Sequence, residues 1–238
     1  MIELLQFAPG MGLMNASPFC MKVEVFLRLA GLEYRTRAVA PLRTPKGKLP
    51  VLRDAGRTIA DSEAIVAYLQ AQYAARLPPA LAVPETGPQL LLRRTIEEHL
   101  YFAALRWRWL DEGAAPHTRV FFDALPAPLR APVFALVRRK MRRDLVGQGL
   151  GRHGGDEICA KARADLDAVA GFLGDRPFFA GDAPGAIDCC AYAFYANLAW
   201  VPVESPMKRH ALEIQSLGAF ADRMKSLAGR EAGVWPPA

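Results

Sequence analysis

The apolar and polar positions of the first forty residues predict a strand, a helix and a second strand. Residues 2–8, IELLQFA, form a short apolar run, as a buried strand does. In residues 17–30 apolar side chains recur at helical spacing on two sides, so we expect a helix that packs on two faces. Residues 33–39, EYRTRAV, alternate in polarity like a strand. This order predicts a right-handed parallel crossover.

A hairpin and a helix are predicted next. The segments LPVLRD and RTIA flank Ala55 and Gly56, which are typical turn residues. Asp61 or Ser62 is then placed to cap a helix with one apolar face. The following residues are rich in proline and lack periodicity, which is typical of a domain boundary.

The rest of the chain has helical periodicity and no convincing strand pattern. The clearest helices are expected at residues 89–111, 157–173, 187–200 and 216–228, whereas prolines and glycines interrupt helical pieces within 113–155. We therefore predict an α/β domain followed by an all-α helical bundle. The expected division is residues 1–75 for the first domain, 76–88 for a linker and 89–238 for the second domain.

The start of the first helix, SPFC, carries two candidate chemical groups. Ser17 is a good N-cap residue, Pro18 suits the first helical position and Gly31 suits the position just past the end. Cys20 follows Ser17 by one turn, where a thiol can have a lowered pKa or can be a small buried residue. The residues alone leave open whether this segment does chemistry or only begins a helix.

Composition narrows the class of protein. The chain has 238 residues, 52% of them hydrophobic and 23% charged, which is typical of a globular protein. Its first residues, MIELLQFAPG, lack the basic flank and long apolar run of a signal peptide. The four cysteines have no metal-ligand spacing, so we expect a reducing, cytoplasmic setting. The four histidines are scattered, and we predict no metal.

The net charge of +6 favours anionic ligands or surfaces, and part of it is concentrated in the run RRKMRR. Such a run is either a solvated helix surface or a weak contact with an anionic membrane or a protein partner. No aromatic platform or nucleic-acid motif accompanies it, so we expect no nucleic-acid binding. The basic residues are Arg138, Arg139, Lys140, Arg142 and Arg143.

Several segments in a fixed order resemble glutathione S-transferases, which have a thioredoxin-like N-terminal domain and an all-helical C-terminal domain. TPKGKLPVL looks like the family's Asn-Pro-x-Gly-x-Val-Pro-x-Leu loop, with Thr44 and Leu49 as departures. IADSEAIVAYL resembles the motif that grips the γ-glutamyl group, and FFAGDAPGAIDCCAYA resembles a helix start in the second domain. In this last motif Gly185 replaces the usual capping serine or threonine, so we expect a small loss of stability. SPFCMKVE also resembles the branch that includes metaxins and failed-axon-connections-like proteins.

The resemblance implies a homodimer that uses glutathione as co-substrate. Ser17 would stabilise its thiolate, and Leu49, before a cis Pro50, would bind its cysteinyl part through the backbone. Ser62 would bind the γ-glutamyl carboxylate and Asp61 the ammonium group. Lys46 and Lys48 would meet the glycyl carboxylate, unless they are simply solvated.

Three functions stay open at this point. The first is transfer of glutathione to a small hydrophobic electrophile, with an acceptor pocket beside the aromatic helix at residues 101–109. The second is a non-catalytic, metaxin-like binding or scaffold module. The third is a glutathione-dependent oxidoreductase that uses Cys20 alone, since the first cysteine of a Cys-x-x-Cys site is replaced by Ser17.

Overall fold

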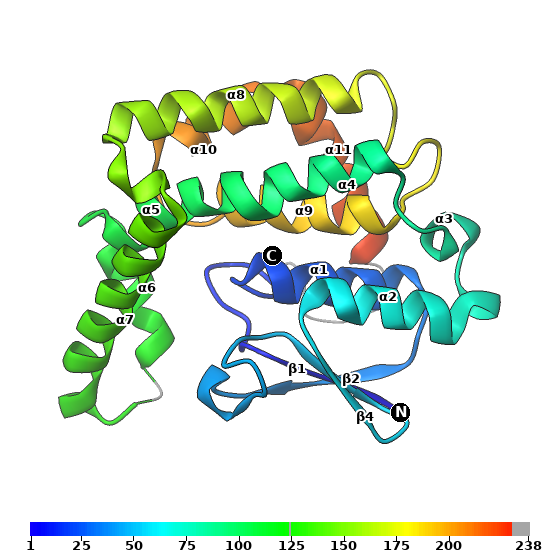
Figure 1. The fold of residues 1–238 in the computed structure, drawn as a ribbon, viewed down its shortest axis with the longest axis horizontal. Helices are drawn as coiled ribbons and strands as arrows, with labels where there is room; N and C mark the ends of the chain where they lie inside the picture. Colours follow the sequence, from blue (N-terminus) through cyan, green and yellow to red (C-terminus); the bar gives the residue numbers. More distant parts are fainter. Residues whose placement is uncertain (124, 230–238) are drawn as a thin grey trace.

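A four-stranded mixed sheet lies at one side of the molecule in the computed structural model, which describes residues 1–123 and 125–229 (Figure 1). The strands lie in the order β2-β1-β3-β4. β1 and β2 are parallel, whereas β3 runs antiparallel to both of its neighbours. The predicted parallel crossover and hairpin are confirmed. The strands are β1 (Ile2–Gln6), β2 (Tyr34–Ala38), β3 (Val51–Asp54) and β4 (Arg57–Ala60).

Helices α1 (Pro18–Leu29) and α2 (Ser62–Tyr73) lie between the sheet and the remaining helices (Figure 1). α1 begins where the sequence predicts, with Ser17 as the N-cap residue. Pro18 occupies the first position, where a backbone N–H would have no intrahelical partner. Past the end of the helix Gly31 has a φ of 61°, a left-handed conformation that glycine adopts without strain.

The centre of the molecule is the contact between α1 and α9 (Ala186–Ala199). Every side chain of residues 20–27 is buried, and so is every residue of α9. α1 packs on α2 on one side and on α9 on another, which confirms the predicted two-sided packing. One apolar core therefore extends through both parts of the chain.

The part of the chain after α2 that the structure describes is helical, as predicted. α4 continues through a π-helical turn, η3, into α5, so that one long helix occupies most of the expected 89–111 segment. Among the described residues, no helix is both long and apolar enough to cross a membrane. The helical segments are α3 (Pro79–Ala82), α4 (Gly87–Arg94), η3 (Thr95–Leu100), α5 (Tyr101–Leu110), α6 (Ala115–Arg119), α7 (Ala127–Gln148), α8 (Gly155–Leu173), α10 (Pro206–Glu213) and α11 (Gln215–Ala228).

The structure gives a reason for the glycine that precedes α9. Asp188 accepts hydrogen bonds from the backbone N–H groups of Phe179 (2.6 Å), Ala180 (3.1 Å) and Gly185 (2.9 Å). A Cβ atom at Gly185 would lie only 2.8 Å from Ala180 Cβ and 3.1 Å from Ala80 O. The missing cap hydroxyl is therefore not a simple loss of stability, because the position has no room for a side chain.

Helices α5, α6 and α7 form an arm on the left of Figure 1, beside the end of the sheet where β1 finishes. A Cβ atom at Gly10, in the loop after β1, would lie 3.6 Å from the Phe121 ring in this arm. α7 is a continuous helix through Pro132, where the sequence predicts interrupted pieces. Pro128 lies in its first turn, where no N–H partner is needed, and Pro132 removes a single intrahelical hydrogen bond.

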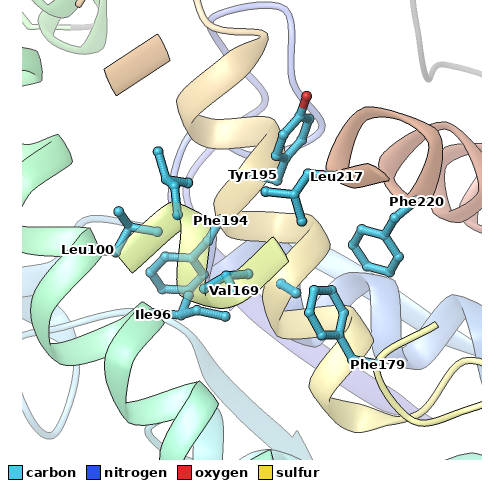
Figure 2. Close-up of a pocket in the computed structure, with 10 residues that line it drawn as sticks. Ile96, Leu100, Val169, Phe179, Phe194, Tyr195, Leu217 and Phe220 are labelled. Carbon is cyan, nitrogen blue, oxygen red and sulfur yellow. The ribbon is translucent and has the colours of Figure 1, made fainter. Parts of the chain in front are cut away.

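A small apolar cavity lies inside the helical part (Figure 2). The side chains of Phe179, Phe194 and Phe220 line it together with Leu100 and Val169. A buried water needs two to four polar partners, and these walls are almost entirely apolar. The cavity is therefore a packing gap of the core and not a substrate site.

Candidate functional site

Ser17 presents its hydroxyl at the N-terminus of α1. The hydroxyl oxygen accepts a long hydrogen bond, 3.4 Å, from the backbone N–H of Cys20. Within the described residues the Ser17 hydroxyl donates to no acceptor, so its proton is available to a ligand. The N-cap role is real, and it leaves the donor function of the same hydroxyl unused.

The turn before Ser17 is fixed by a buried asparagine that sequence reasoning missed. Asn15 Oδ1 accepts a hydrogen bond from the backbone N–H of Ser17 at 3.0 Å, and Asn15 Nδ2 donates to the Phe7 carbonyl at 2.8 Å. Asn15 is fully buried. An asparagine two residues before a helix cap is a recognisable turn signal, and it could have marked this residue as the one that orients Ser17.

The Leu49–Pro50 peptide bond is cis, as the resemblance implies. It lies directly before β3, and both residues are buried. Thr44, which replaces the family's asparagine, keeps the preceding loop closed, because its Oγ1 lies 2.6 Å from the Pro41 carbonyl oxygen and 2.9 Å from that of Lys48. The departure from the family pattern therefore retains a polar group that holds the loop.

The start of α2 combines a strained backbone with a cap. Asp61 has a φ of 102°, and its Oδ1 accepts hydrogen bonds from the N–H groups of Glu63 (2.9 Å) and Ala64 (3.3 Å). Strain of this kind in a residue other than glycine is common at ligand sites. Ser62 is buried. Asp61 thus caps the helix, and the Ser62 hydroxyl has no hydrogen-bond partner among the described residues.

These three segments meet at one end of the sheet. Cys20, one turn into α1, packs with Leu49 and Val51 in one apolar cluster. The backbone N–H of Asp61 donates to the Pro50 carbonyl at 3.5 Å. The structure therefore brings together the helix start, the cis peptide and the start of α2, which the sequence separates by more than forty residues.

Cys20 has the environment of a packing residue. Its side chain is fully buried, and burial raises the pKa of its thiol to about 12. At neutral pH the thiol is protonated, and a protonated, inaccessible thiol is neither a nucleophile nor a partner for a mixed disulfide. This geometry does not support catalysis by Cys20.

The lysines of the loop and the basic run of α7 lie outside this cluster. Lys46 and Lys48 are exposed, and within the described residues neither forms an ion pair. Arg138 forms contacts within the chain. Its Nη2 lies 2.7 Å from Glu112 Oε1, and its Nε donates to the Trp109 carbonyl at 2.8 Å. The remaining basic side chains of the run, Arg139, Lys140, Arg142 and Arg143, are exposed.

One small cavity borders the start of α1, between α5 and α9. Tyr101 and Leu105 line it beside Pro18, whereas Trp109 stacks on Phe121 within the arm, with ring centroids 6.0 Å apart. The sequence had left open which aromatic residues of α5 face a pocket. Of the side chains of this helix, aromatic Tyr101 and aliphatic Leu105 line the wall beside the candidate site.

Two further residues at this wall were not predicted from the sequence. Arg108 Nη1 donates to the Ala16 carbonyl at 2.7 Å, and Asn197 Nδ2 donates to the Asn15 carbonyl at 3.2 Å. Both side chains are buried and come from the helical part of the chain. Arg108 stands among aromatic residues in RWRW, a local pattern that does not indicate a partner far along the chain.

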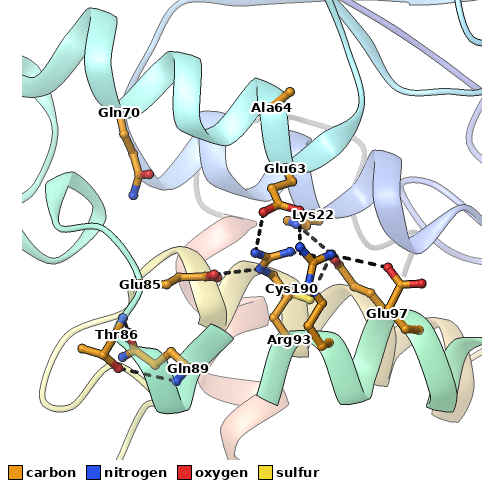
Figure 3. A network of polar contacts seen from close by, with 12 residues as sticks. Lys22, Glu63, Ala64, Gln70, Glu85, Thr86, Gln89, Arg93, Glu97 and Cys190 are labelled. Atoms are coloured by element: carbon orange, nitrogen blue, oxygen red, sulfur yellow. Dashed lines mark hydrogen bonds and ion pairs between the residues drawn. The ribbon is translucent and has the colours of Figure 1, made fainter. Parts of the chain in front are cut away.

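A buried network of ion pairs joins the start of α2 to the helical part (Figure 3). Lys22 Nζ lies 2.7 Å from Glu97 Oε1. Arg93 contacts three carboxylates, at 3.1 Å for Glu97, 2.7 Å for Glu85 and 2.8 Å for Glu63. The hydrogen bond from Arg93 lowers the pKa of Glu63 below its usual range. Because Glu63 directly follows the candidate ligand residue at the start of α2, the network fixes that helix end.

The described residues contain no group of three or more His, Cys, Asp or Glu side chains that could hold a metal ion. The polar groups of the candidate site are instead a hydroxyl at each of two helix N-termini and the backbone before a cis proline. Helix N-termini and free hydroxyl groups suit an anionic or hydrogen-bonding ligand. An extended peptide-like molecule with a carboxylate at one end fits this set of groups.

Comparison with known proteins agrees with these features. Residues 18–114 match the family description "Glutathione S-transferase N-terminal domain", and residues 162–224 match "Glutathione S-transferase, C-terminal domain". The chain is 31% identical to the isoprene-epoxide glutathione S-transferase of Rhodococcus sp., over 85% of this chain and 88% of that protein.

Other similar proteins have different names. Failed axon connections of Drosophila melanogaster is 29% identical over 94% of this chain and 57% of its own length. Metaxin-1 of Macaca fascicularis is 26% identical over 95% of this chain and 74% of its own length. The chain thus spans little more than half of the Drosophila protein.

Solved structures share the fold. A glutathione S-transferase of Ceriporiopsis subvermispora in complex with glutathione matches with a TM-score of 0.68, at 22% identity and 98% coverage of both chains. A glutathione transferase of Phanerochaete chrysosporium matches with a TM-score of 0.64, at 20% identity and 98% coverage of both chains. With the sequence matches, these likenesses lead to one conclusion: the chain belongs to the glutathione S-transferase family.

Proposed function

We propose that this protein is a glutathione transferase in which Ser17 stabilises the glutathione thiolate for attack on a small, apolar electrophile. The observation that carries the proposal is the free donor of the Ser17 hydroxyl at the N-terminus of α1. In this arrangement glutathione lies along the backbone of Leu49. Its γ-glutamyl carboxylate accepts from the Ser62 hydroxyl and the start of α2, and Asp61 faces the ammonium group.

The energy required matches what this site can supply. A thiol with a reference pKa of about 8.5 needs a shift of about two units to be mostly ionised at neutral pH, or about 2.7 kcal/mol. A hydrogen bond to a charged group contributes about 1.5–3 kcal/mol. The N-terminus of a helix adds about 0.3–1 kcal/mol. One hydroxyl at the start of α1 is therefore sufficient.

The reaction then follows from the position of the sulfur. The Ser17 hydroxyl donates a hydrogen bond to the thiolate, whose lone pair attacks an electrophilic carbon and forms a thioether bond. The leaving group departs with the electron pair of the broken bond; in an epoxide the ring oxygen takes this pair and then a proton from water. A small epoxide is the first electrophile to test, because the relative in Rhodococcus is named for isoprene epoxide. The apolar side chains around Leu105 suit such a molecule.

The main experiment compares wild type with Ser17→Ala and Cys20→Ala. The assays are retention on immobilised glutathione and turnover of a chlorodinitrobenzene and of isoprene epoxide. We expect Ser17→Ala to lower kcat/KM by roughly 10- to 100-fold, the loss of one hydrogen bond to a charged sulfur. Cys20→Ala is the matched control one turn away, and we expect it to retain activity. Disulfide reduction that depends on Cys20 would contradict the proposal in favour of an oxidoreductase.

A non-catalytic binding or scaffold module is the second candidate. It is favoured by the similarity to Failed axon connections and Metaxin-1 over nearly the whole chain. If the wild type neither binds glutathione nor turns over either electrophile, the transferase proposal fails and this candidate replaces it. The homodimer that the family resemblance implies is checked on the same samples by light scattering after gel filtration.

A further inference from the structure

Arg108 is a buried cation that has no counter-charge in the described part of the chain. Its side chain is only 9% exposed. Nη1 donates to the Ala16 carbonyl at 2.7 Å and to Asn197 Oδ1 at 3.2 Å, and Nη2 donates to the Asn197 carbonyl. All three acceptors are neutral, and no carboxylate within the described residues forms an ion pair with this guanidinium.

Two other buried cations, Lys22 and Arg93, form ion pairs with carboxylates. Lys22 lies 2.7 Å from Glu97, and Arg93 contacts three carboxylates. Burial of an unpaired charge is costly, and the cost appears at Arg108 as a pKa lowered by burial to about 10. This value still leaves the guanidinium charged at neutral pH.

The titratable groups packed around Arg108 do not balance it. Tyr101 lines the same cavity, and burial raises the pKa of its phenol. Burial also raises the pKa of Cys20, on α1, to about 12. Both groups are neutral at neutral pH, and Asp144, whose charge contributes to the raised pKa of Tyr101, is paired with Lys140 at 2.5 Å. Arg108 itself has no ion-pair partner among the described residues.

The Arg108 guanidinium is hydrogen-bonded to the peptide group that directly precedes Ser17. The carbonyl that Arg108 binds belongs to the peptide bond between Ala16 and Ser17. Arg108 also lines the cavity beside Pro18. From backbone dimensions, the guanidinium is within about 8 Å of the Ser17 hydroxyl.

We propose that Arg108 supplies the positive charge that balances the glutathione thiolate held at Ser17. The inference rests on the proposed transferase function and adds a second group to the site. Arg108 acts at a distance and through the Ala16 carbonyl, so it is a positioning residue. The thiolate of bound glutathione would supply the negative charge that the buried Arg108 guanidinium lacks in the protein alone.

The expected size follows from Coulomb's law. The sulfur lies one hydrogen bond, about 3 Å, beyond the Ser17 hydroxyl, so the guanidinium is about 8–11 Å from it. At an effective dielectric constant of about 20, a unit charge at this distance shifts the pKa of a thiol by about one to one and a half units. Loss of the Ser17 hydroxyl alone should therefore leave the thiol pKa of bound glutathione still below that of free glutathione. Loss of both groups should return it close to the free value.

The test measures the thiol pKa of bound glutathione from the ultraviolet absorbance of the thiolate as the pH is varied. Arg108→Gln removes the charge and leaves a shorter, neutral side chain, and we expect it to raise the thiol pKa by about one unit. Arg108→Lys keeps the charge and should restore most of the shift. Arg139→Met removes an exposed charge of α7 and is the matched control, with no expected change.

A second route does not depend on Arg108 being replaced. Asn197→Asp places a carboxylate where Asn197 Oδ1 now accepts from Arg108, which neutralises the guanidinium in position, and it also removes the amide that donates to the Asn15 carbonyl. It should raise the thiol pKa as Arg108→Gln does. Affinity for S-methylglutathione, which has no ionisable thiol, should change much less in these variants than affinity for glutathione. Equal losses for both ligands would assign Arg108 a purely structural role.

The outcomes separate the two proposals. If wild type binds and uses glutathione but the thiol pKa is the same in Arg108→Gln and Asn197→Asp as in wild type, the role of Arg108 is refuted and the transferase function stands. If wild type does not bind glutathione, both proposals are refuted together.

Discussion

Replacing Gly185 with serine should destabilise the protein, although the family pattern has a capping hydroxyl at this position. The sequence suggests a gain, because serine completes a capping box with Asp188 and is a slightly better cap than glycine. The structure predicts a loss of stability instead. The new Cβ atom would lie 2.8 Å from Ala180 Cβ and 3.1 Å from the Ala80 carbonyl oxygen, and both neighbours must shift.

The magnitude follows from these opposing effects. Overpacking of a tight site costs about 1–3 kcal/mol. Reduced freedom of the unfolded chain returns about 0.4–1 kcal/mol, since a φ of −107° suits any residue, and the better cap returns a few tenths of a kcal/mol. From the centres of these ranges, the net loss is about 1 kcal/mol. For a chain of this size that corresponds to a fall in Tm of about 2–4 °C.

The assay is thermal unfolding of wild type, Gly185→Ser and a matched control, Gly154→Ser. Gly154 is the N-cap residue of α8, and a Cβ atom there would meet nothing closer than Glu157 Oε2 at 3.6 Å. The control should therefore leave Tm unchanged or raise it slightly. Ala180→Gly in the Gly185→Ser background should recover part of the loss. A Tm for Gly185→Ser at or above that of wild type would refute the steric argument.

Two further predictions concern charged residues. Glu97→Gln leaves Lys22 buried without a carboxylate, so we expect the free energy of unfolding in denaturant to fall by about 3–5 kcal/mol. The double variant Lys22→Met/Glu97→Leu should recover much of this loss, and a double variant no better than the single one would contradict the electrostatic explanation. On the arm, we expect wild type to sediment weakly with phosphatidylserine vesicles at low salt and not with neutral vesicles. The reversal Arg139→Glu/Arg142→Glu/Arg143→Glu should abolish this binding while glutathione turnover is retained; binding that survives the reversal would place the contact elsewhere.

The parts of the fold that local pattern controls were predictable from the sequence. The period of apolar residues and the cap residues located α1, α2 and the hairpin, because these depend on neighbours within a few positions. The continuous α7 was not expected, since single prolines are read as breaks although one lost hydrogen bond is tolerated in a long helix. The role of Gly185 was also hidden, because its neighbours Ala80 and Ala180 are distant or separated by a turn.

In the candidate site, too, some residues could be predicted from local sequence patterns and others could not. Ser17 and the cis Pro50 follow from local motifs, and the burial of Cys20 follows from its place in the apolar stripe. Arg108 and Asn197 lie more than eighty residues from the turn that they hold, and no local pattern indicates such a partner. The sequence therefore predicted the groups that we propose to face the ligand, but not the residues that hold the turn next to them.

The hydrogen bonds from Arg108 and Asn197 to the turn before α1 have a consequence for modularity. The carbonyl groups of Ala16 and Asn15 are satisfied by side chains of the second half of the chain. A thioredoxin-like half transplanted onto another helical half would lose the partners that set the position of Ser17. A functional chimera between relatives must therefore take residues 108 and 197 from the same parent as the turn at residues 15–17. At this site the two halves of the chain cannot be exchanged independently.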